Sequence, residues 1–261
     1  MRFGINGSLK KALVGIKTGY DYAEIPISKL RQEGETAIEM IETEFRLHHF
    51  GADVFNGFLP SDIQIYDGGK AAIKYAEENI EIARRLGARI MVIGSGKARL
   101  VPETMKKEDA FASFVEIVGN IAEMAAPYGI KIAVEPLNYG ETNLINTLED
   151  GMTFARAVGL PNVGCMVDFY HFARNNESFS IFNALRPGEL IHVHVARPDE
   201  TRGALRREDI SAVQQWADVL KSIRYDGDVT LEAVFGSNLE TEFSESLRVL
   251  QILRRQEQRS W

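Results

Sequence analysis

Short apolar runs recur along the chain at intervals that suit an alternation of strands and helices. Eight of these runs contain few polar residues, which is typical of strands buried on both faces of a parallel sheet. We expect strands at residues 2–6, 22–25, 46–49, 90–93, 131–135, 163–168, 190–195 and 228–232. Their regular spacing favours parallel strands that are joined by crossover connections.

Segments with apolar residues at helical spacing lie between these runs. We expect helices over residues 70–86, 108–128, 148–158, 210–223 and 239–255. Because the alternation continues without a Pro/Ser-rich linker or a strong repeat, it predicts one α/β domain over residues 1–261. Eight strands favour a closed (β/α)₈ TIM barrel, and an open doubly wound sheet is the alternative.

The composition is that of an ordinary globular protein. The chain has 261 residues, of which 45% are hydrophobic and 26% charged, and its formal net charge is −7. This length suits an eight-stranded barrel, which needs roughly 250 residues. The acidic balance argues against a nucleic-acid partner. The short basic cluster of Arg202, Arg206 and Arg207 is predicted to be solvated surface.

Cysteine usage and the N-terminus indicate the cellular setting. Cys165 is the single cysteine, so no intrachain disulfide can form, and its apolar surroundings predict a buried side chain. The first residues lack the apolar stretch of a signal peptide. No run approaches the roughly 18 apolar residues of a membrane span. We expect a cytoplasmic protein without membrane contact, with homo-oligomerisation left open.

Polar residues close the last four predicted strands. They are Glu135, Asp168, His194 and Glu232, in strand order. In a barrel of parallel strands these ends open onto one face, where active sites are built. Three carboxylates crowded on this face repel one another unless a cation lies between them. Because three carboxylates and one imidazole suit Mn²⁺, Mg²⁺ or Co²⁺, we expect these residues to hold one divalent metal ion, with Mn²⁺ as the first choice.

The segments around these residues match the motifs of a known family. EPLN at 135–138, VDFYH at 167–171, HVH at 192–194 and LEAVF at 231–235 occur in the family's order. The chain thus resembles the xylose isomerase-like barrel superfamily, and within it the D-tagatose 3-epimerase and D-psicose 3-epimerase branch of sugar isomerases. The resemblance is loose over the whole chain and close over residues 131–235.

This resemblance implies a metal-dependent sugar isomerase or epimerase. It matches the four strand-end residues to the metal ligands, and Glu135 and Glu232 to the pair that moves protons on opposite faces of the substrate. The implied substrate is a ketose or a related polyhydroxy carbonyl compound. Its proton next to the carbonyl would be removed to form a metal-bound enediolate and then returned to carbon. No organic cofactor is implied.

The resemblance also implies residues that bind the substrate. His171 matches a substrate-binding histidine, and Glu141 matches the carboxylate that supports it. An arginine after the strand-seven histidine usually holds the substrate, and here Arg197 and Arg202 compete for that role. The branch commonly has a basic residue after EPLN, where this chain has Tyr139. This departure borders the substrate pocket, so the resemblance does not identify the sugar.

Other functions of the same barrel stay open as alternatives. Lyases such as inosose or dehydroshikimate dehydratases eliminate water after the same enolisation. Endonuclease IV shares the barrel, but it uses more metal ligands and a DNA-binding surface, which the acidic charge disfavours. A non-catalytic sugar-binding barrel would not require two opposed carboxylates.

Four further residues and one loop are candidates for the pocket. Asn6 and Glu24 end the first and second predicted strands and could touch the substrate. His48 and His49 would end the third strand, with one of them facing the pocket. The aromatic loop at residues 55–60 is predicted to be a lid that excludes water from the site, with a simply packed loop as the alternative.

Overall fold

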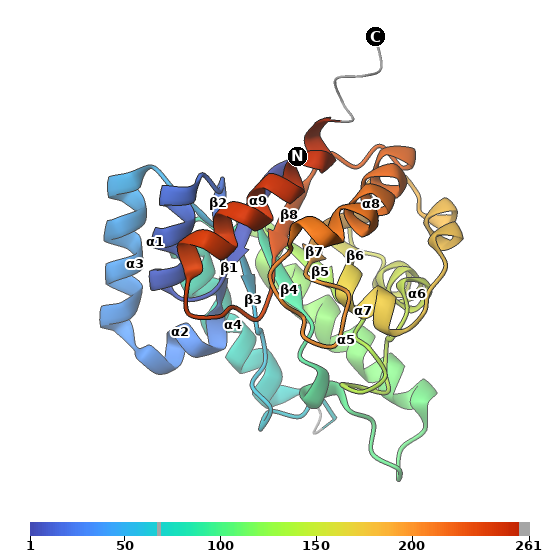
Figure 1. Cartoon of the computed structure of the whole chain (residues 1–261). Coiled ribbons are helices and arrows are strands. Elements are labelled where there is room, and N and C mark those ends of the chain that lie inside the picture. Colours follow the sequence, from blue (N-terminus) through green and yellow to red (C-terminus); the bar gives the residue numbers. More distant parts are fainter. Residues whose placement is uncertain (67–68, 256–261) are drawn as a thin grey trace.

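The structure of the chain, a computed structural model, describes residues 1–66 and 69–255. In these residues eight parallel strands close into a barrel in the order of the sequence, from β1 to β8 (Figure 1). The strands are β1 (Arg2–Asn6), β2 (Tyr22–Pro26), β3 (Ala52–Asn56), β4 (Ile90–Ile93), β5 (Lys131–Val134), β6 (Val163–Asp168), β7 (Leu190–Val195) and β8 (Asp228–Leu231). The predicted (β/α)₈ TIM barrel is therefore confirmed.

Helices surround the strands (Figure 1). They are α1 (Leu9–Thr18), α2 (Ile27–Glu33), α3 (Glu35–His48), α4 (Lys70–Arg85), α5 (Lys107–Ala125), α6 (Leu148–Val158), α7 (Phe169–Arg174), α8 (Ile210–Ser222) and α9 (Leu239–Arg255). Short 3₁₀ helices occupy Gly96–Arg99, Ala126–Tyr128, Phe179–Ala184 and Arg207–Asp209. Predicted helices 148–158 and 239–255 have the observed bounds, and the other three differ by only a few residues at their ends.

The predicted third strand, residues 46–49, is wrong. These residues belong to α3 and the residue that caps it, and the buried residues of α3 recur at helical spacing. The helix ends where His49 takes a left-handed backbone with φ of 50°, and β3 follows three residues later. His48 and His49 are both exposed, so neither faces the pocket. A four-residue run was too short to distinguish the end of an amphipathic helix from a strand.

The barrel interior changes from apolar to polar along the strands. Six inward side chains form an apolar cluster: Tyr22, Val54, Ile90, Val92, Ala133 and Met166. Because alternate residues of a strand share a face, Glu24 follows Tyr22 on the same face of β2, nearer the carboxyl end. His192 and His194 alternate in the same way on β7. The carboxyl end of the barrel is therefore lined by polar side chains.

Two predictions about buried residues have different outcomes. Cys165 is fully buried, as the sequence predicted. The predicted lid at residues 55–60 is wrong, because Phe55 belongs to β3 and Phe58 is fully buried. Asn79 of α4 donates a hydrogen bond from Nδ2 to the Phe58 carbonyl at 2.8 Å, so the loop packs against α4.

None of the helices in residues 1–66 and 69–255 is long and apolar enough to cross a membrane.

Candidate active site

The structure brings the four predicted metal ligands together at the carboxyl end of the barrel. Ligand atoms of Glu135, Asp168, His194 and Glu232 all lie within 4.8 Å of one another. Glu135 directly follows β5 and Glu232 directly follows β8, whereas Asp168 belongs to β6 and His194 to β7. Asp168 pairs in register with His194 across these neighbouring strands, and both are buried. We call these four residues the metal cluster.

The two nitrogens of His194 face different carboxylates. Nδ1 lies 3.1 Å from Glu232 Oε2 and 3.3 Å from Glu135 Oε1. Nε2 lies 2.9 Å from Glu24 Oε1, on the other side of the ring. Burial alone would lower the pKa of His194, but Glu24 and Glu232 outweigh it and raise the pKa well above its usual range. One nitrogen thus points into the metal cluster while a buried carboxylate holds the other.

Glu24 belongs to a buried chain of polar side chains beneath the metal cluster. Its Oε2 lies 3.0 Å from His192 Nε2, and that nitrogen lies 3.2 Å from Thr230 Oγ1. Thr230 in turn lies 2.8 Å from the Tyr22 hydroxyl. Each of these side chains is fully buried. Glu24 therefore supports His194 from inside the barrel, and the expectation that it could touch the substrate is wrong.

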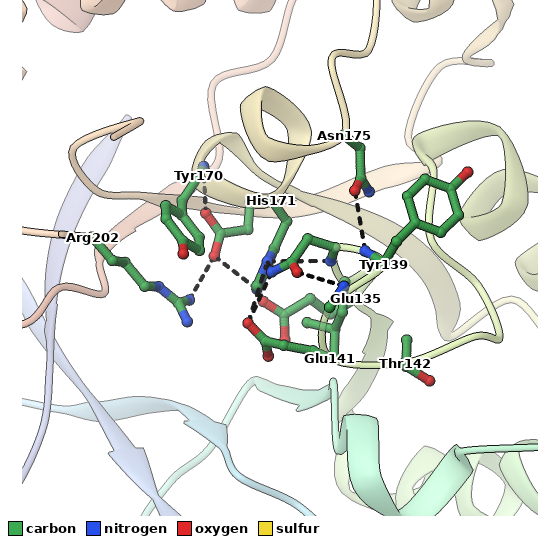
Figure 2. A network of polar contacts seen from close by, with 12 residues as sticks. Glu135, Tyr139, Glu141, Thr142, Tyr170, His171, Asn175 and Arg202 are labelled. Carbon is green, nitrogen blue, oxygen red and sulfur yellow. Dashed lines mark hydrogen bonds and ion pairs between the residues drawn. The ribbon is translucent and has the colours of Figure 1, made fainter. Parts of the chain in front are cut away.

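The structure separates the two candidate arginines. Arg202 Nη2 lies 2.7 Å from Asp168 Oδ2 and 2.6 Å from Glu232 Oε2. The Arg202 guanidinium lies over the Tyr170 ring, 4.9 Å from its centre (Figure 2). Arg197 instead pairs with Asp209, with Nε 3.3 Å from Oδ2. Only Arg202 of the two reaches the metal cluster, so the prediction that Arg202 is solvated surface is wrong.

A contact between distant segments places Arg202. Gly203 forms a parallel bridge with Val234, and the Val234 N–H donates to the Arg202 carbonyl at 2.8 Å. The loop after β7 is thereby attached to the segment after β8, which begins with Glu232. Burial alone would raise the pKa of Glu232, but His194 and Arg202 outweigh it and lower the pKa to about 2.

His171 and Glu141 meet through Asn138. His171 Nδ1 lies 2.8 Å from Asn138 Nδ2 and accepts from the Asn138 backbone N–H at 3.3 Å (Figure 2). Asn138 Nδ2 also donates to Glu141 Oε1 at 2.9 Å, whereas Glu141 Oε1 itself lies 3.8 Å from His171 Nδ1. Because N–H donors face Nδ1, the proton of a neutral imidazole belongs on Nε2. That nitrogen lies 3.6 Å from Asp168 Oδ2, beside the metal cluster.

Three residues that position the two glutamates were not predicted from the sequence. Asn56 donates from Nδ2 to Glu232 Oε1 at 2.7 Å. Arg99 is fully buried and donates to the Glu135 carbonyl at 2.7 Å. Gly94 leaves room for Glu135, because a Cβ at this position would overlap the Glu135 Oε2. Asn56 was hidden by the misplaced third strand, whereas the signal for Gly94 was a glycine directly after an apolar strand.

The donor set and its surroundings fit a divalent metal ion and a polar ligand. Three carboxylates and one imidazole nitrogen converge, as such an ion requires. Several buried atoms in the described part of the chain have no hydrogen-bond partner, and three of them belong to side chains that lie against the carboxylates of Asp168 or Glu232: His171 Nε2, Asn56 Oδ1 and Arg202 Nε. Because unpaired buried polar atoms are unfavourable, these are the atoms that a bound ligand would satisfy.

Comparisons with known proteins agree with this geometry. The chain is 31% identical to D-psicose 3-epimerase of Ruminiclostridium cellulolyticum over 237 residues, which cover 86% of the chain and 79% of that protein. It is 30% identical to inosose isomerase of Bacillus velezensis over 171 residues, covering 64% of the chain and 59% of that protein. The crystal structure of IOLI protein with a zinc atom matches 98% of the chain and 99% of that protein, at a TM-score of 0.79 and 20% identity. The family model described as xylose isomerase-like TIM barrel matches residues 16–253, and the chain belongs to this family.

Proposed function

We propose that the chain is a divalent-metal-dependent sugar isomerase or epimerase that acts on a ketose or a related polyhydroxy carbonyl compound. The observation that carries this proposal is the pair of carboxylates, Glu135 and Glu232, that both face Nδ1 of His194 within the metal cluster. The relatives named D-psicose 3-epimerase and inosose isomerase support the same class of reaction.

The metal cluster would hold the ion through its three carboxylates and His194 Nδ1. Oxygen-rich donors with one imidazole favour Mn²⁺, with Mg²⁺ and Co²⁺ as alternatives. The zinc atom in the structurally similar IOLI protein supports a divalent-metal site in this fold. A bound divalent ion supplies Lewis-acid polarisation of a carbonyl oxygen next to the reacting carbon.

The side chains around the metal cluster would move protons and hold the substrate. One of Glu135 and Glu232 removes the proton from the carbon next to the carbonyl. In an epimerisation the other glutamate returns a proton to the opposite face, and in an isomerisation the proton returns to the adjacent carbon. Nε2 of His171 and Nε of Arg202 are N–H donors without a partner in the described residues, so they would bind substrate oxygens.

Two alternatives share this first step. The similarity to inosose isomerase favours a second candidate, in which the substrate is a cyclic inosose. A lyase of the same superfamily would remove the same proton but then expel water from an inosose or a dehydroshikimate. The carbonyl compound and the fate of its neighbouring hydroxyl distinguish the three reactions.

Proton exchange in deuterated water tests the proposal directly. The protein is stripped of metal with a chelator, reloaded with Mn²⁺, Mg²⁺ or Co²⁺, and incubated with D-psicose, D-fructose, an inosose and dehydroshikimate. We expect metal-dependent uptake of deuterium on the carbon next to the carbonyl of a ketose, together with an epimer or isomer, by NMR. The stripped protein is the control. Loss of water would favour the lyase, and no exchange with any substrate and metal would refute the proposal.

A further inference from the structure

The side chain of Asn175 leaves its own helix and contacts the loop after β5. Asn175 directly follows α7, and its backbone N–H bonds to carbonyls of that helix, among them the His171 carbonyl at 3.0 Å. Its side chain instead accepts from the Tyr139 N–H through Oδ1 at 3.2 Å and donates from Nδ2 to the Asn146 carbonyl at 2.8 Å (Figure 2). Capping of α7 therefore does not explain the side chain of Asn175.

Asn175 holds both halves of the loop at residues 136–147. Within this loop the buried Asn146 donates from Nδ2 to the Leu137 carbonyl at 2.9 Å, so the start and the end of the loop are joined. Tyr139 lies in the first half of the loop and Asn146 in the second. The two hydrogen bonds of the Asn175 side chain therefore attach the closed loop, as one unit, to the end of α7.

The attached loop carries Asn138, which faces His171. Asn138 Nδ2 lies 2.8 Å from His171 Nδ1, and the Asn138 backbone N–H donates to the same nitrogen at 3.3 Å. Two other contacts determine which end of the Asn138 amide faces the ring: Oδ1 accepts from the Gly140 N–H at 2.9 Å, and Nδ2 donates to Glu141 Oε1 at 2.9 Å. Because His171 Nδ1 faces two donors, it accepts, and the proton of the neutral ring belongs on Nε2.

Two attachments thus join one turn of α7 to two consecutive residues of the loop. His171 bonds to Asn138, and Asn175 bonds to Tyr139, the next residue along the chain. Hydrogen bonds weaken steeply as their distance and angle depart from the preferred values, so the contact at His171 requires that the loop stays in place. Without the hydrogen bonds of Asn175 the loop would be free to move from the ring, and Nδ1 would lose the donors that it faces.

We propose that Asn175 is a positioning residue that acts through Asn138 and keeps the His171 proton on Nε2, where this N–H binds a substrate oxygen. The inference rests on the proposed function, because it assumes that Nε2 of His171 contacts the substrate. Nε2 is buried without a hydrogen-bond partner in the described residues, and it lies 3.6 Å from Asp168 Oδ2, beside the metal cluster. A donor that is in place before the substrate arrives avoids the cost of ordering it on binding.

The position of the His171 proton is measurable by NMR without any substrate. Protein with ¹⁵N-labelled histidine is loaded with diamagnetic Mg²⁺ and studied at alkaline pH, where an imidazole is neutral. The signals that His171→Gln removes identify the ring. We expect the Nε2–H tautomer in the unmodified protein and a clear rise of the Nδ1–H tautomer in Asn175→Leu, which keeps the size of the side chain but removes both hydrogen bonds. The same tautomer in both proteins would refute the proposal.

Two further variants separate positioning from the general stability of the loop. Asn143 lies in the same loop and also forms two hydrogen bonds, accepting from the Val101 N–H at 2.8 Å and donating to the Val101 carbonyl at 3.0 Å. Asn143→Leu should leave the His171 tautomer unchanged, and an equal change in Asn143→Leu and Asn175→Leu would refute the proposal. Asn175→Asp keeps the acceptor oxygen but removes the donor, so it should shift the tautomer less and in the same direction. It is the decisive variant if Asn175→Leu folds poorly, and an unchanged tautomer in it would equally refute the proposal.

Turnover distinguishes this proposal from the proposed function. With Mn²⁺ and D-psicose, Asn175→Leu should raise KM up to about tenfold with a smaller change in kcat, because the affected hydrogen bond is present before the reaction as well as during it. Asn143→Leu should leave KM unchanged. An Asn175-dependent tautomer in a protein that turns over no ketose would support the positioning of His171 and refute the isomerase. Turnover with the same KM and the same tautomer in all variants would support the isomerase and refute the positioning role.

Discussion

The two ends of the barrel carry charged clusters of opposite character. At the amino end, Arg2 and Arg89 each pair with both Asp53 and Asp228. Arg2 Nη2 lies 2.5 Å from Asp53 Oδ2, and Arg2 Nε lies 3.0 Å from Asp228 Oδ1. Two positive and two negative side chains thus satisfy one another, and they join the starts of β1 and β8 to β3 and the residue before β4.

At the carboxyl end the charges do not balance within the described residues. The carboxylates of the metal cluster and Glu24 outnumber His194 and Arg202, the cations that contact them. Buried polar atoms beside them also lack partners, whereas none of the four residues at the amino end has an unpaired buried atom. A balanced cluster stabilises the fold, and an unbalanced one with open donors and acceptors indicates a binding site. Three predictions test this difference between the two ends, and a fourth concerns a carboxylate outside both clusters.

Glutamine substitutions in the proposed proton-transfer pair, Glu135 and Glu232, should have the largest effect. Glu135→Gln and Glu232→Gln keep the shape and one coordinating oxygen but cannot accept a proton from carbon. We expect each to lower turnover by about a thousandfold or more at saturating Mn²⁺, while part of the metal is retained. One variant can still exchange a substrate proton with solvent if each glutamate serves one face. Turnover near that of the unmodified protein in either variant would contradict the two-glutamate mechanism.

A single methyl group beside Glu135 should have the next largest effect. Gly94→Ala places a Cβ where the Glu135 Oε2 now lies, so this carboxylate must move. A displacement of about 1 Å in a catalytic group can lower turnover roughly a hundredfold. Gly119→Ala is the control, because no heavy atom lies within 4 Å of its Cβ, and a helical alanine should stabilise α5 slightly. Equal turnover in the two variants would show that Glu135 needs no fixed position.

Removal of the charge behind His194 should weaken metal binding. Glu24→Gln keeps the size of the side chain but removes the carboxylate that holds Nε2. Partners of this kind typically change metal affinity about 10–100-fold, so we expect a loss of this size in a Mn²⁺ titration. Asp53→Asn, the control from the amino end, should lower the free energy of unfolding by ~2 kcal/mol and leave Mn²⁺ affinity unchanged. If Glu24→Gln and Asp53→Asn both lower the free energy of unfolding and leave Mn²⁺ affinity unchanged, then Glu24 stabilises the fold as Asp53 does and does not support metal binding.

A carboxylate outside both clusters should give the smallest effect. Glu177 accepts from the Leu148 N–H at 2.8 Å, and burial raises its pKa to about 7. The pKa of Glu177 is higher in the folded protein than its unfolded value of 4.5, so the protonated side chain favours folding. This stabilisation is fully present below pH 4.5 and is lost as the pH rises through about 7. Glu177→Gln should therefore flatten the unfolding free energy between pH 5 and pH 8, by no more than ~1 kcal/mol after solvent screening. Chemical denaturation at pH 5 and at pH 8 measures the free energy of unfolding. The same difference between the two pH values in Glu177→Gln and in the unmodified protein would contradict the prediction.

Local patterns in the sequence were enough to predict most of the barrel and the residues of the metal cluster. Strands and helices differ in the period of their apolar residues, and this period is readable over one element. The cluster residues close or directly follow four apolar runs, and parallel strands of one barrel end on the same face. The pattern failed where a four-residue apolar run, residues 46–49, was taken for a strand although it ends the 14-residue helix α3. The observed strand β3 and the helices α1, α2, α3 and α7 were not predicted.

Contacts between distant segments set the rest of the site. Two arginines five residues apart were equivalent along the chain, and the bridge between Gly203 and Val234 brought only Arg202 to the metal cluster. Glu24 was at a strand end like the other candidates, but it lies inside the barrel because its register places it against His192 and His194. Hydrogen bonds and ion pairs act over about 3–4 Å, so they depend on which segments lie side by side, and no pattern within one segment records that.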